Sequence, residues 1–264
     1  MIKVKEQNII YEDKEVFEKI KERIKTQSVW DINISAFAEK SMHKMLKYYL
    51  EPDEIFHEKK VCGHIADIYK NNMITEIQSI NFSAVKEKIK HYLEYKENKI
   101  TFVYPVAAVR NMCWVDKKTG ETSKITKSLK FIDIYKFYEE IYHIKDFMGE
   151  ENFNLKILLL EVLEYKFLDG WGKFRKNNAT KIDKVPVSKV GEENFNGKND
   201  YLKLIPSKLR EEGMFTVFDL KKETGMGEKA IRSFIYVMKN AGLITENGRK
   251  NRYICYKISQ NDLK

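Results

Sequence analysis

Residues 57–79, HEKKVCGHIADIYKNNMITEIQS, hold the pattern that decides the fold of this chain. We interpret the stretch as three short strands, at residues 57–61, 64–70 and 73–80. Two tight turns separate them, at Cys62-Gly63 and at Asn71-Asn72. Gly and Asn tolerate the positive φ angles that two-residue hairpin loops require. The stretch therefore predicts an antiparallel meander.

Two carboxylates in this stretch are placed to meet across the predicted strands. Asp67 lies near the end of the second strand, and Glu76 lies inside the third. Because side chains along a strand alternate between its faces, Glu76 and Gln78 share a face while Ile77 points the other way. An antiparallel return brings Asp67 and Glu76 within reach of one ion.

Amphipathic segments on both sides of the meander predict helices. Residues 31–50 form the first, and Glu39 and His43 share a side of it because they are four positions apart. Glu39 is either a third acid of the same site or one half of a surface Glu–His pair. Residues 83–95 form the second helix, and the apolar run at 99–107 predicts a buried strand. The expected order is helix, three strands, helix, strand.

That order, with Asp67 followed nine positions later by Glu76-Ile77-Gln78, resembles the PD-(D/E)XK nuclease superfamily over residues 31–107. The resemblance implies an α/β fold, with a restriction-endonuclease-like mixed sheet flanked by helices. It also implies that Asp67, Glu76 and the main chain of Ile77 hold Mg²⁺ or Mn²⁺, and that Glu39 assists them from the first helix. Gln78 departs from the pattern, because the superfamily usually has lysine there.

The chemistry of such a site can be stated from its residues. Hydrolysis of a phosphodiester needs stabilised charge on the phosphate and a hydroxide near neutral pH, and an ion held by two carboxylates supplies both. Mg²⁺ suits a site with few carboxylates because it keeps several of its waters. Gln78 can position a water but cannot supply charge or take a proton. Lys60, on the first strand, is our candidate for the missing lysine.

The middle of the chain is less informative. The apolar run at residues 155–167 suits a buried strand, although its length and its Leu and Glu content allow a helix, and we favour the strand. Aromatic, basic and glycine residues alternate at 168–176, which suits either a loop that contacts nucleic acid through Lys173 and Arg175 or a turn anchored by its tryptophan. Residues 177–199 are polar with little periodicity and predict a linker. We therefore expect a nuclease-like domain over residues 1–176, the linker, and a second domain over 200–264.

The segment after the linker has its own pattern. It predicts three helices, the third at 228–240, and then a hairpin that turns at Asn247-Gly248. This order resembles a winged helix-turn-helix domain. From residue 201 onward there are 13 basic and seven acidic residues, which give +6 of the net charge of +9 for the whole chain. The alternative is a winged helix that contacts proteins, with its charges solvated.

The winged-helix resemblance implies that the third helix enters the major groove and that the hairpin touches the backbone or the minor groove. The residues expected to face DNA from the helix are Lys229, Arg232, Ser233 and Tyr236. Those expected on the hairpin are Arg249, Lys250 and Arg252.

Composition sets the remaining limits. The chain has 264 residues, of which 43% are hydrophobic and 33% are charged, which indicates a folded protein. Its net charge of +9 favours an anionic partner. Three scattered cysteines argue against disulfides and zinc, and no apolar run approaches a membrane span. We expect a cytoplasmic protein with DNA as its partner, RNA being the weaker alternative, and a homodimer if both strands are cut. Its function is either metal-dependent DNA cleavage or, if the site is inactive, DNA binding by a regulator.

Overall fold

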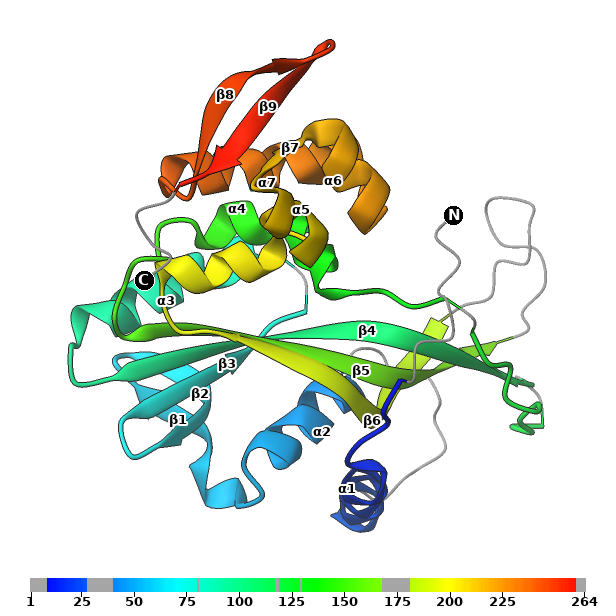
Figure 1. Cartoon of the computed structure of the whole chain (residues 1–264). Helices are drawn as coiled ribbons and strands as arrows, with labels where there is room; N and C mark the ends of the chain where they lie inside the picture. Colours follow the sequence, from blue (N-terminus) through cyan, green and yellow to red (C-terminus); the bar gives the residue numbers. More distant parts are fainter. Residues whose placement is uncertain are drawn as a thin grey trace.

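A computed structural model describes residues 9–27, 40–79, 81–116, 119–128, 130–167 and 181–259 (Figure 1). Its centre is a six-stranded mixed sheet in which the strands lie side by side in chain order, β1 to β6. The strands are β1 (His57–Val61), β2 (His64–Lys70), β3 (Met73–Ile77), β4 (Lys99–Val115), β5 (Phe153–Phe167) and β6 (Lys181–Phe195). Helices flank this sheet, which confirms the predicted α/β class with a mixed sheet.

The first three strands form the predicted antiparallel meander. Gly63 and both asparagines of the second turn, Asn71 and Asn72, have φ between 51° and 79°, the left-handed values that made them turn residues in the sequence. The crossover from β3 runs through the 3₁₀ turn η3 (Phe82–Val85) and helix α3 (Lys86–Glu94) to β4, which pairs parallel to β3. β5 is parallel to β4, and β6 returns antiparallel.

Two apolar clusters pack on the two faces of the sheet. Helices α1 (Lys14–Gln27) and α2 (Lys40–Leu50) cover one face, where Phe17 and Leu46 are fully buried against Val103 and Leu158. Helix α3 covers the other face, together with short helical segments that follow β4 in the chain (Figure 1). These segments are η4 (Ile134–Glu139) and α4 (Ile141–Ile144), and another short turn, η2 (Glu54–Phe56), precedes β1.

The C-terminal part consists of three helices and a three-stranded sheet. Its elements are η5 (Lys198–Leu204), α5 (Ser207–Glu212), β7 (Met214–Thr216), α6 (Val217–Thr224), α7 (Glu228–Asn240), β8 (Ile244–Lys250) and β9 (Tyr253–Ile258), with sheet order β7-β9-β8. Thr216 and Asp219 form a capping box at the start of α6. The buried side chains of this part join those of the α3 face in one continuous cluster, in which Phe234 of α7 stacks on Tyr138 of η4 with ring centroids 4.0 Å apart.

Two local predictions are wrong. The segment 177–199 was expected to be a linker, but residues 181–195 form β6, the edge strand that pairs along the length of β5. Its polar residues are compatible with an edge position. Pro186 is tolerated there because the N–H groups on the open side of an edge strand have no partner strand to bond. In the C-terminal hairpin, the chain turns at Asn251-Arg252 rather than at Asn247-Gly248. The Asn-Gly pair instead forms a bulge, where the register between β8 and β9 shifts.

Candidate functional site

The two predicted acids lie where strands β2 and β3 separate. The ladder between these strands runs from the turn to the pair Ile68 and Thr75. One residue further on, Asp67 replaces the main chain of β2 as a partner: its Oδ2 accepts the N–H of Ile77 at 2.7 Å. We call this place, defined by Asp67, Glu76 and Ile77, the strand fork. The fork holds one acid on each strand.

Asp67 is fixed from the side of α2. Its Oδ2 lies 3.0 Å from Nε2 of His43, and only 18% of its side chain is exposed. Burial by itself raises the pKa of Asp67, but the hydrogen bond and charge of His43, together with the N–H of Ile77, outweigh it and keep this pKa below its ordinary value. Asp67 is therefore ionised at neutral pH.

Glu76 is fixed from the side of α3. Its carboxylate pairs with Nζ of Lys88 at 2.7 Å and accepts the hydroxyl of Tyr92 at 3.2 Å, and the residue is only 3% exposed. Burial, and then repulsion by Asp67, raise the pKa of Glu76 to about 7, although Lys88 and Tyr92 act in the opposite direction. The two acids thus interact electrostatically, and their pKa values are pushed apart.

This separation of pKa values has chemical consequences. A carboxyl that titrates near neutral pH can exchange a proton under physiological conditions, and its neighbour remains an anion. A cation near Glu76 would favour its ionised form. A buried carboxyl beside a second carboxylate lowers the stability of the folded protein. An arrangement with that cost is a candidate functional site.

The other predicted site residues differ in where they lie relative to the strand fork. Gln78 follows the fork, half-buried, and its N–H donates to the carbonyl of Val103 at 3.0 Å. Lys60 is exposed on the edge strand β1, opposite Ile65, and is not the cation that contacts Glu76. Glu39 lies outside the described residues. Among the residues that are described, no three His, Cys, Asp or Glu side chains are grouped so that they could hold a metal ion.

The sequence analysis missed Lys88 and Tyr92 as parts of the site. A signal for Lys88 was present, because it lies three residues after Val85 and four before Tyr92, on the apolar stripe of its helix. A lysine on such a stripe needs an acidic partner. Its side chain is 21% exposed and its partner is Glu76, which is 12 positions away in the chain.

The predicted DNA-facing residues of the C-terminal part gather on two elements. On α7, Lys229, Arg232 and Tyr236 are exposed and Ser233 is half-buried. Arg249, Lys250 and Arg252 are all exposed at the end of the β8–β9 hairpin, which projects from the body of the molecule (Figure 1). Lys173 and Arg175 lie outside the described residues.

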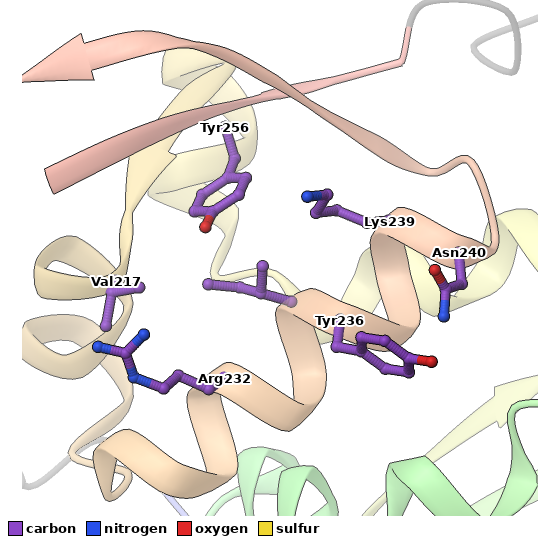
Figure 2. A pocket seen from close by; sticks show the side chains of 7 residues that line it. Val217, Arg232, Tyr236, Lys239, Asn240 and Tyr256 are labelled. Carbon is purple, nitrogen blue, oxygen red and sulfur yellow. The ribbon is translucent and has the colours of Figure 1, made fainter.

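A pocket of about 310 Å³ lies between α7 and the hairpin (Figure 2). Arg232 and Tyr236 line it, as do five residues that were not predicted from the sequence: Val217, Ile235, Lys239, Asn240 and Tyr256. Each of the two cations has an acidic partner. Arg232 pairs with Glu228 at 2.6 Å on the same helix, and Lys239 pairs with Glu246 of β8. The charges of both cations at the pocket are thus balanced by carboxylates of the C-terminal part.

Comparisons with known proteins identify a family but no function. The family described as Domain of unknown function (DUF8091) matches residues 40–196, which is more than half of the chain. The matched residues include the strand fork and all six strands of the central sheet. No curated protein and no solved structure matches the chain. Among the described residues, no helix is both long and apolar enough to span a membrane.

Proposed function

The chain belongs to this family of unknown function, and from the strand fork we propose that it is a metal-dependent nuclease of the PD-(D/E)XK type. The observation that carries the proposal is the pair of acids on β2 and β3, brought together where the two strands part, with the pKa of Glu76 raised to about 7. The strand order supports it: an antiparallel meander, a crossover through α3, and β4 parallel to β3. This order is compatible with the core that the resemblance implies.

The residues at the fork fit a hard divalent cation. Mg²⁺ is typically bound through one or two carboxylates and keeps several waters, so it needs no third side chain. Asp67 and Glu76 would hold it, with the main chain of Ile77 beside them. When bound, such an ion polarises the phosphate and lowers the pKa of a coordinated water.

The remaining groups are assigned roles by their contacts. His43 orients Asp67 and keeps it ionised. Lys88 supplies the positive charge that Gln78 lacks, since its ammonium reaches Glu76 from α3. There it can stabilise negative charge that develops on the phosphate. Gln78, which directly follows β3, positions the attacking water through its amide.

The C-terminal part is proposed to be a winged helix that binds DNA. Three helices followed by a hairpin, an exposed basic face on α7, and a projecting hairpin tip with Arg249, Lys250 and Arg252 support this. Phosphate contacts of this kind release counterions, so binding should weaken steeply as salt rises.

A second candidate is a DNA-binding protein whose fork is inactive. Two observations favour it: the acids already have partners in His43 and Lys88, and Gln78 replaces the usual lysine. The two candidates differ in whether the protein cuts DNA at all.

The test is cleavage of supercoiled DNA by the full chain and by two lysine variants. We expect nicking with Mg²⁺ or Mn²⁺ and none with a chelator. Lys88→Ala should slow it about 10²–10³-fold, the usual cost of losing one preorganised charge donor, whereas Lys60→Ala should leave it within about twofold. Lys88→Arg should recover part of the rate.

Two outcomes decide against parts of this proposal. If the wild type binds DNA but cuts nothing with either metal between pH 6 and 9, the second candidate is correct. If the Lys60 variant loses activity and the Lys88 variant does not, the charge comes from β1, and our assignment of Lys88 is wrong.

A further inference from the structure

Two histidines meet on the surface between the sheet and α3. His64 begins β2 and His91 lies near the end of α3, and Nε2 of His64 is 2.9 Å from Nδ1 of His91. The edge of the Tyr92 ring packs beside His64, with ring centroids 5.8 Å apart. The side chain of His91 is 54% exposed, so the paired nitrogens are accessible from solvent. We call these two residues the histidine pair.

A carboxylate lies near one of the two rings. Oε2 of Glu94, one helical turn after His91, lies 3.7 Å from Nε2 of His91, the nitrogen that does not face His64. This distance is longer than a hydrogen bond, but a negative charge there still favours a proton on Nε2 over one on Nδ1, the nitrogen that faces His64. Histidines that bind metals are commonly held in this way, by a carboxylate at the second ring nitrogen.

The spacing of the pair, which is that of a hydrogen bond between the rings, also allows both nitrogens to reach one ion. Nitrogens bound at about 2.0–2.1 Å in neighbouring positions at a right angle lie about 2.9 Å apart, whereas a tetrahedral ion needs about 3.3 Å. We propose that His64 and His91 bind a first-row transition-metal ion with octahedral or tetragonal geometry, of the Ni²⁺ or Cu²⁺ class. Water fills the other positions, since no group of three such ligands exists among the described residues. The ion is therefore exchangeable.

This site is separate from the strand fork in both its ligands and its ion. Two imidazoles suit first-row transition metals such as nickel or copper, whereas the carboxylates of the fork suit Mg²⁺. The histidine pair nevertheless connects the elements that carry the fork. His64 lies three residues before Asp67 on β2, and His91 lies three residues after Lys88 on α3. A bound ion would fasten α3 to β2.

The experiment is calorimetric titration of NiCl₂ into the untagged full chain at pH 7.5, with MgCl₂ as the control ion. We expect one Ni²⁺ per chain, and a rise in melting temperature when Ni²⁺ is added. His64→Gln and His91→Gln should each weaken Ni²⁺ binding more than tenfold and remove that rise. The matched control is His143→Gln on α4, which should bind as the wild type does. Glu94→Gln should weaken binding about tenfold and keep the 1:1 ratio.

The proposal would be overturned by an absence of Ni²⁺ binding in the wild type, or by binding that survives both substitutions. If Asp67→Asn removes the bound Ni²⁺ and the two histidine variants do not, the ion belongs to the strand fork, and the histidine pair is only a hydrogen bond. Melting temperatures measured without metal show whether the variants are folded, so a loss of binding cannot be confused with unfolding.

Discussion

Replacement of Asp67 by Asn is expected to abolish metal-dependent DNA cleavage while DNA binding is retained. Asn can still accept the N–H of Ile77 and remain beside His43, so the strand fork should keep its shape. It cannot supply the charge that holds the ion. The ion contributes several kcal/mol of transition-state stabilisation, and about 4 kcal/mol corresponds to about 10³-fold in rate.

The measurement is the single-turnover nicking rate of Asp67→Asn beside its affinity for a DNA duplex. Asp146→Asn is a matched control, because Asp146 is a surface partner of Lys86 away from the fork, and it should cut at the wild-type rate. Full activity in Asp67→Asn would show that the fork is not the catalytic centre, whatever the DNA affinity.

Replacement of Phe234 by Ala is expected to destabilise the whole chain by about 3–5 kcal/mol. Phe234 has no exposed surface and stacks on Tyr138, which is also fully buried and donates its hydroxyl to the carbonyl of Leu204. Removal of the ring leaves a cavity in the cluster that joins α7 to the α3 face of the sheet. Because this cluster is continuous, the sheet and the C-terminal part should unfold in one transition.

Urea unfolding, followed both by tyrosine fluorescence and by far-ultraviolet circular dichroism, measures this effect. Lys229→Ala, an exposed change on the same helix, should alter the free energy of unfolding by less than about 0.5 kcal/mol. Two separate transitions, only one of which responds to Phe234→Ala, would mean that the C-terminal part folds independently of the sheet.

The meander and its crossover were predictable because their signals are local. Turn residues that accept positive φ lie between short β-prone runs. The apolar residues of α3 are close together in the sequence, so their helical spacing is visible without knowledge of the rest of the chain. Strand alternation also placed Glu76 correctly, on the opposite face from Ile77, which packs against α2 and its neighbours. The acids of the fork follow from those local patterns.

The errors involve residues whose environment is set by distant parts of the chain. β6 has the polar composition of a loop, and only its pairing with β5 makes it a strand. Asn247-Gly248 can serve either as a turn or as a bulge, and the pairing with β9 decides between them. Lys60 and Lys88 were equally available lysines in the sequence, and only the packing of α3 on the sheet brings Lys88 to Glu76.

We propose that Asp67 and Glu76 together bind a divalent cation, and we would test this by measuring proton-linked Mg²⁺ binding. At pH 6.5 most Glu76 carboxyls hold a proton, since the pKa is about 7, and binding must release it. Titration of MgCl₂ in two buffers with different ionisation enthalpies should show one ion bound and about 0.5–1 proton released. Glu76→Gln should release none, and Asp67→Asn should not bind. Equal heats and equal proton release in all three proteins, or no binding in the wild type, would contradict the claim.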